Sequence, residues 1–88
     1  MIKEKVVLNN EEGLHARPAA KFVQKAHKYA SDIEIEYEGN KVNGKSIIGI
    51  MSLGAYYKEE ITLIIQGNDE KKAAEELVSF LENGFEEV

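Results

Sequence analysis

Apolar and polar residues alternate along three stretches of the chain, a pattern typical of strands with one buried face. The stretches cover residues 2–8, 33–37 and 60–66, and a short fourth strand is expected around Val42. In the last stretch, Ile61, Leu63 and Ile65 are predicted to face inward. Each strand should therefore contribute one apolar face to a common core.

Apolar residues spaced three or four apart predict helices between these strands. The first helix should run from about residue 16 to residue 29. Its expected core positions are Ala19, Phe22, Val23, Ala26 and Ala30. A short apolar helix is expected over residues 47–53, with Ser46 as its N-cap and Gly54 at its end.

A third helix should follow Gly67, and we expect Asn68 to cap it. Its predicted buried positions are Ala73, Ala74, Leu77, Phe80 and Leu81. Gly84 should end the helix in a left-handed conformation, so that Phe85 folds back on Phe80. The element order βαββαβα predicts a single α+β domain over residues 1–88, with helices on one face of a four-stranded sheet.

Composition limits the possible functions. The chain has 88 residues, of which 43% are hydrophobic and 31% charged, as expected for one small globular domain. It has no cysteine, so neither a disulfide framework nor a thiolate zinc site is expected. A net charge of −5 argues against nucleic-acid binding, and no apolar run is long enough for a signal or a membrane span. We therefore expect a cytoplasmic protein.

Positive charge is concentrated in one part of this acidic chain. Residues 13–31 contain no Asp or Glu, but they contain Arg17, Lys21, Lys25 and Lys28. The spacing of these four residues places them on one helical face. This basic stripe is either a solvated helix face or a docking surface for acidic partners.

The sharpest chemical feature is His15, which is expected at the start of the first helix, with Arg17 two residues later and Pro18 inside the first turn. The free N–H groups and the helix dipole favour an anion there, above all a phosphate. The imidazole offers a nitrogen to carry the phosphate, and the guanidinium can clamp its oxygens. The alternative is an ordinary surface histidine. A metal site shared with His27 is not expected, because roughly 18 Å of helix would separate the two.

The segment Gly13-Leu14-His15-Ala16-Arg17-Pro18-Ala19 resembles the phosphorylation site of HPr, the histidine-containing phosphocarrier family of the phosphoenolpyruvate:sugar phosphotransferase system. Residues 45–54 resemble the second signature of that family, in its Gram-positive form. The resemblance implies an open-faced sandwich with an antiparallel sheet in the order 1-4-2-3. It also implies that His15 accepts a phosphoryl group on Nδ1 from enzyme I and passes it to enzyme IIA domains, while Arg17 contacts the phosphate. Such a protein is a monomeric carrier without cofactor or metal, rather than an enzyme.

The resemblance also implies regulation and docking. Ser46 matches the serine that HPr kinase/phosphorylase modifies in Gram-positive members, in the form that binds catabolite control protein A. A serine that only caps a helix is the alternative. The implied partner-binding residues are Ala20, Lys21, Gln24, Lys45, Ile47, Ile48 and Met51.

The chain departs from the family pattern at Glu12, Gly44, Ile48 and the pair Tyr56-Tyr57. Glu12 replaces a usual Ser or Thr, and it could pair with Arg17 or oppose the phosphate. Tyr56 and Tyr57 occupy a normally smaller loop, where we expect packing; an extra contact surface is the alternative.

Other functional classes stay open beside the sugar carrier. They are a regulatory paralogue and a nitrogen-branch phosphocarrier. His15 argues against the regulatory-only protein of bacilli, which lacks the active histidine. A nucleic-acid module conflicts with the Glu-rich second strand, and no general base or substrate pocket indicates an enzyme.

Overall fold

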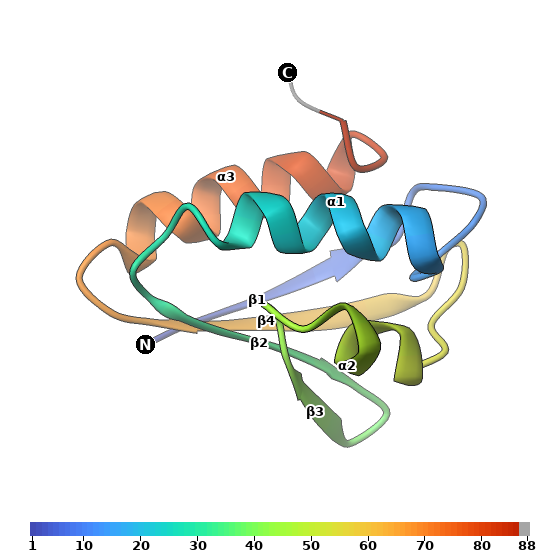
Figure 1. The fold of residues 1–88 in the computed structure, drawn as a ribbon, viewed down its shortest axis with the longest axis horizontal. Helices are drawn as coiled ribbons and strands as arrows, with labels where there is room; N and C mark the ends of the chain where they lie inside the picture. Colours follow the sequence, from blue (N-terminus) through green and yellow to red (C-terminus); the bar gives the residue numbers. More distant parts are fainter. Residues whose placement is uncertain (87–88) are drawn as a thin grey trace.

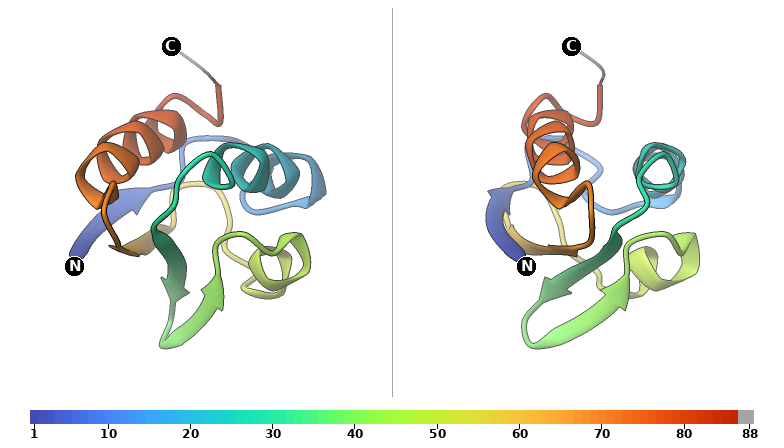
Figure 2. Two further views of the ribbon diagram at one scale, coloured as in Figure 1. Left: turned by 60° about the vertical axis from the view of Figure 1, so that its left-hand side comes forward. Right: turned by 90° about the vertical axis from the view of Figure 1, so that its left-hand side faces the viewer.

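A computed structural model describes residues 1–86 as a sheet covered by helices. The elements are β1 (Ile2–Val7), α1 (Ala16–Ala26), β2 (Asp32–Tyr37), β3 (Asn40–Asn43), α2 (Ile47–Ser52), β4 (Glu60–Gln66) and α3 (Glu70–Glu82) (Figure 1). The four strands are antiparallel, in the order β1-β4-β2-β3, and the helices lie on one face (Figure 2). The predicted fold, including its strand order, is confirmed.

The core lies between the sheet and the two longer helices. β4 pairs with both β1 and β2, so it is central, and Ile61, Leu63 and Ile65 are all buried as predicted. The predicted stripe of α3 is buried as well. Among residues 1–86, no helix has the length and apolar content needed to cross a lipid bilayer.

The end of α1 differs from the prediction. The helix ends at Ala26 with His27 as C-cap, three residues before the expected end. The amide of Tyr29 then donates to the carbonyl of Ala26 at 3.2 Å, so the chain leaves the helical path. Because the helical spacing no longer applies, Tyr29 is buried and Ala30, which was expected in the core, is exposed.

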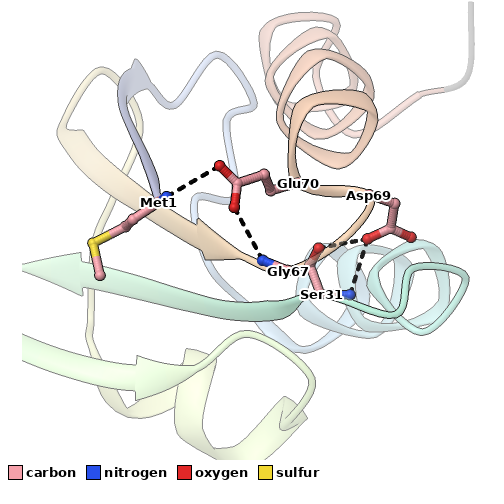
Figure 3. Close-up of polar contacts among 5 residues, drawn as sticks. All are labelled: Met1, Ser31, Gly67, Asp69 and Glu70. Atoms are coloured by element: carbon pink, nitrogen blue, oxygen red, sulfur yellow. Dashed lines mark hydrogen bonds and ion pairs between the residues drawn. The ribbon is translucent and has the colours of Figure 1, made fainter.

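The start of α3 also corrects a prediction, because its N-cap position is held by Asp69 and not by Asn68. The Asp69 carboxylate does not cap its own helix. It accepts the amide of Ala30 at 2.8 Å. It also accepts the amide of Ser31 at 3.0 Å and the Ser31 hydroxyl (Figure 3). Asp69 therefore ties the turn after α1 to the start of α3, a long-range contact that no local sequence pattern indicates.

Glu70 makes the second connection at this end of the molecule. One carboxylate oxygen accepts the Gly67 amide at 3.1 Å, and the other contacts the Met1 amino group at 3.1 Å (Figure 3). At the opposite end of α3, Gly84 has φ +70°, and the Phe85 ring meets the Phe80 ring edge to face at 5.8 Å. The predicted left-handed stop and its aromatic contact are confirmed.

Candidate functional site

His15 is the N-cap of α1, and its backbone and side chain have separate roles. The backbone is extended, with φ −83° and ψ 180°, and its carbonyl accepts the Ala19 amide at 2.9 Å. The imidazole makes no capping hydrogen bond, and the residue is exposed. The backbone of His15 therefore forms the helix start, while its imidazole takes no part in capping the helix.

The first turn of α1 creates a positive electrostatic environment around this imidazole. The amides of Ala16 and Arg17 have no acceptor within the helix, and Pro18 has no amide proton. No acidic residue occupies the first turn, and the Arg17 side chain is exposed. Free amides, the helix dipole and a guanidinium together suit an anion such as a phosphate.

The loop that leads to His15 is pressed against the loop before β4. Gly13 has φ +62°, and a Cβ there would lie 2.5 Å from the Ala55 carbonyl oxygen and 2.7 Å from the Tyr56 Cα. The Leu14 amide donates to that same carbonyl at 3.0 Å. Only glycine fits both the backbone angle and the close approach.

A small hollow of about 150 Å³ adjoins His15 and joins three segments of the chain. Its lining consists of Leu14, His15, Met51, Gly54, Ala55 and Tyr56. The hollow brings the start of α1 next to the end of α2, although the two helices are far apart in the sequence. The hollow is small and open to the surface.

α2 supplies an apolar surface close to the hollow. Ser46 caps the helix, since its Oγ accepts the Gly49 amide at 3.1 Å, as predicted. Three apolar residues of this helix are exposed: Ile47, Ile48 and Met51. The exposed fraction of Ile48 is 81%. Ile50 is buried. The exposed residues are those that the sequence assigned to partner contact, although contact itself stays a prediction.

The basic residues differ in how far they are engaged within the chain. Lys21 Nζ lies 3.3 Å from the Glu86 carboxylate, and Lys25 Nζ lies 5.5 Å from the centre of the Phe80 ring. Lys45 donates to the Tyr29 carbonyl at 2.8 Å. Ala20 is half-buried and Gln24 exposed on α1. Lys45 thus has a structural bond in addition to its predicted docking role.

Glu12 is exposed, and within residues 1–86 it forms no ion pair with Arg17. Pairing with that guanidinium, one of the two possibilities for Glu12, is therefore absent from this structure. Tyr56 and Tyr57 are 63% and 45% exposed, so both keep a large free surface where loop packing was expected.

Sequence reasoning missed Glu59, which is hydrogen-bonded to Tyr56 of the hollow. Its carboxylate accepts the Tyr56 amide at 2.7 Å and the Tyr37 hydroxyl at 2.6 Å. These two hydrogen bonds, that of Tyr37 first, lower the pKa of Glu59. The same bond, with smaller effects of desolvation and nearby negative charge, raises the pKa of Tyr37 to about 12. Nothing in the local sequence signals a contact across 22 positions.

Fold and site together define a small open-faced α+β sandwich with an exposed histidine at the start of a helix. The chain belongs to the HPr family: the family model described as "PTS HPr component phosphorylation site" matches residues 2–83. The family expected from the two sequence motifs is confirmed.

The relatives within this family include proteins named HPr and proteins named Crh. The HPr-like protein Crh of Bacillus subtilis is 48% identical over 82 residues, covering 93% of this chain and 96% of Crh. The crystal structure of HPr-C-His from Thermoanaerobacter tengcongensis is 46% identical, covers both chains fully and superposes with a TM-score of 0.93. A crystal structure of Bacillus subtilis Crh, described as a domain-swapped, intertwined dimer, is 45% identical with a TM-score of 0.78, covering 99% of this chain and 100% of that one.

Proposed function

We propose that this protein is a phosphocarrier of the phosphoenolpyruvate:sugar phosphotransferase system in the cytoplasm. His15 accepts a phosphoryl group from phospho-enzyme I and passes it to sugar-specific enzyme IIA domains. The observation that carries this proposal is the exposed imidazole at the N-terminus of α1, free of any capping bond and followed by an exposed Arg17. Membership of the HPr family supports the same assignment.

The chemistry needs positioning and charge stabilisation more than a pocket. Neutral His15 carries its proton on Nε2 and attacks phosphorus with the lone pair of Nδ1. As the Nδ1–P bond forms, the bond between phosphorus and the donor atom of enzyme I breaks, and the donor keeps that electron pair. The oxygens of the transferring group meet Arg17 and the free first-turn amides. In the transfer to enzyme IIA, the acceptor atom of enzyme IIA attacks the phosphorus. The Nδ1–P bond breaks, and Nδ1 of His15 keeps the electron pair.

Two different surfaces serve docking in this proposal. Ile47, Ile48 and Met51 form an apolar patch on α2, of a kind that marks protein interfaces. On α1, Lys21 adds a positive charge, with Ala20 and Gln24 on the same helix. An apolar centre with a charged rim favours brief, steered encounters, which a carrier needs.

Ser46 is proposed as a regulatory phosphorylation site for an HPr kinase/phosphorylase, in a form that binds catabolite control protein A. Its Oγ already faces the Gly49 amide at the start of α2, so a phosphate would meet a helix N-terminus that favours negative charge. The same phosphate would add about two negative charges beside the apolar patch. Phosphorylation there should therefore slow transfer at His15.

A regulatory paralogue is the second candidate, because Crh proteins are among the close relatives, at 48% and 50% identity. His15 favours the carrier over that alternative. The Crh relative is described as a dimer, whereas we propose that this chain is a monomer. Both candidates keep the same fold.

Incubation with enzyme I and labelled phosphoenolpyruvate tests the proposal. The wild type and His27→Ala should take up acid-labile label, and His15→Ala should take up none; these are the chain's two histidines. His27 is exposed at the other end of α1, so it is a matched control. If an active enzyme I leaves the wild type unlabelled, the carrier assignment is wrong.

A further inference from the structure

The proposed function leaves Tyr56 unused, although Tyr56 lines the same hollow as His15 and Met51. Tyr56 is 63% exposed, in the loop between α2 and β4. Single exposed apolar residues are ordinary on protein surfaces. Tyr56 differs from those because the hollow connects it with the exposed Met51 and with the reactive imidazole.

Glu59 fixes the backbone of Tyr56 from behind. The Tyr56 amide donates to one carboxylate oxygen of Glu59 at 2.7 Å, and the Glu59 amide donates to the Tyr56 carbonyl at 3.1 Å. The other carboxylate oxygen accepts the Tyr37 hydroxyl at 2.6 Å, from the end of β2. The loop is thereby attached to the sheet through one carboxylate.

Backbone hydrogen bonds also tie this loop to the segment that carries His15. The Lys58 amide donates to the Leu8 carbonyl at 2.8 Å, and the Leu8 amide donates to the Glu59 carbonyl at 2.9 Å. Farther along, the Ala55 carbonyl accepts the Leu14 amide at 3.0 Å. Figure 1 shows the two loops side by side at the end of the molecule where α1 begins.

The backbone of Tyr56 is therefore held in place before any partner arrives. An interface residue that is already ordered loses little conformational entropy on binding, and tyrosine has only two side-chain torsions to fix. Its ring can exclude water from a contact while its hydroxyl keeps a polar partner at the rim. These properties are typical of residues that dominate binding energy.

We propose that Tyr56 is a specificity-determining residue for docking of the phosphoryl-donor protein, and that Glu59 is the positioning residue that holds it beside His15. This inference rests on the proposed function. A donor that delivers a phosphoryl group to His15 must cover the hollow, so its surface meets both Met51 and Tyr56. The donor surface that fits is apolar, with a hydrogen-bonding group at its edge.

Steady-state transfer from enzyme I tests the role of Tyr56. Tyr56→Ala should raise the KM of enzyme I for this protein about tenfold with kcat little changed, because truncating a central interface aromatic commonly has an effect of that size. Tyr56→Phe should keep most of the affinity. Tyr57→Ala is the matched control, since Tyr57 is the adjacent exposed tyrosine and lies outside the lining of the hollow.

The role of Glu59 is tested by coupling. Glu59→Ala should raise KM as Tyr56→Ala does, and the double variant should be no worse than Tyr56→Ala, because both changes remove one effect. Glu59→Gln, which keeps an acceptor for the Tyr56 amide, should restore the affinity. Additive increases in KM would show that Glu59 acts independently of Tyr56 and would overturn its positioning role.

The outcomes separate this inference from the proposed function. Absence of label on the wild type overturns the phosphocarrier assignment itself. A labelled wild type with an unchanged KM for Tyr56→Ala overturns the inference alone, as does an equal rise for Tyr57→Ala, which would reflect the loop in general. Thermal melts of each variant identify any loss of folding.

Discussion

The hydroxyl of Tyr37 donates a hydrogen bond to the carboxylate of Glu59 at 2.6 Å, joining the end of β2 to the loop before β4. The contact is linked to the hollow beside His15, because the same carboxylate accepts the amide of Tyr56, which lines that hollow. A bond between a phenol and a carboxylate favours the neutral phenol and the charged carboxylate. The two pKa values therefore move apart, upward for Tyr37 and downward for Glu59.

Tyrosine ionisation measures this contact directly. The protein has four tyrosines, and the pKa of Tyr37 is raised to about 12. An ultraviolet titration should include a tyrosine step near that pH, and this step should be lost in Tyr37→Phe. In Glu59→Ala, the step should move down toward the ordinary tyrosine value of about 10. An unchanged titration of Glu59→Ala would mean that the carboxylate does not bind this hydroxyl in solution.

Asp69 should make the free energy of unfolding depend on pH in the acid range. Hydrogen bonds from Ser31, and from the amide of Ala30, lower the pKa of the Asp69 carboxyl in the folded protein. Its contribution is fully present above the unfolded value, about 3.9, and is lost as the pH falls through the lower folded value. Asp69→Asn should therefore be less stable at neutral pH and should flatten this part of the acid dependence.

Urea unfolding between pH values of about 2 and 7 measures the effect of Asp69 across this window, with Asp32→Asn as the control. Asp32 is an exposed aspartate at the start of β2, close to the same turn. If the two variants show the same acid dependence, the contacts of Asp69 with the turn after α1 do not stabilise the folded state.

Gly13 should be more sensitive to substitution than another glycine with a similar backbone. Gly13 and Gly39 have φ +62° and +82°, but an added Cβ meets the Ala55 carbonyl at 2.5 Å only in the first case. Gly39→Ala should cost about 1 kcal/mol from backbone strain alone. Gly13→Ala should cost roughly 1–3 kcal/mol more, because the two loops must separate.

Chemical unfolding compares the two alanine variants, and transfer from enzyme I adds a second measurement. Separation of the loops moves Leu14 and His15, so Gly13→Ala should also slow phosphoryl transfer, whereas Gly39→Ala should not. Equal stability losses at the two positions would contradict the close packing of the loops.

Ser46 has a structural role that is separable from regulation. Ser46→Ala removes the acceptor for the Gly49 amide and should cost about 1 kcal/mol in urea unfolding. Ser46→Asp keeps a capping carboxylate, so stability should be retained while transfer to His15 slows. Normal transfer in Ser46→Asp would argue that negative charge at this position does not regulate the carrier.

Periodicity predicted the elements well where the pattern was local. The strand over residues 60–66 and the buried stripe of α3 follow directly from spacing and need no tertiary information. The strand order came from the family resemblance alone, because alternation shows which face is buried but not which strands are neighbours. Alternation also did not predict that Ile64 is buried. This residue belongs to the outer face of β4, where it lies between its sheet partners Lys3 of β1 and Glu34 of β2.

In the site, too, features set by neighbouring residues were predictable and contacts between distant residues were not. His15, Arg17 and Ser46 stand in short motifs, so their positions at two helix starts were predictable. The contacts of Asp69 and Glu59 were not, because their partners Ser31 and Tyr37 lie far away in the sequence. The cap expected at Asn68 failed for this reason: α3 begins where Asp69 can reach the turn after α1.

The central claim is that His15 is the phosphoryl acceptor, and NMR of the imidazole nitrogens after treatment with enzyme I and phosphoenolpyruvate tests it most directly. We expect a phosphorus coupled to Nδ1 of His15, with His27 unmodified, and loss of that signal when an enzyme IIA domain is added. An unmodified His15 in the presence of an active enzyme I, or phosphate on another residue, would contradict it.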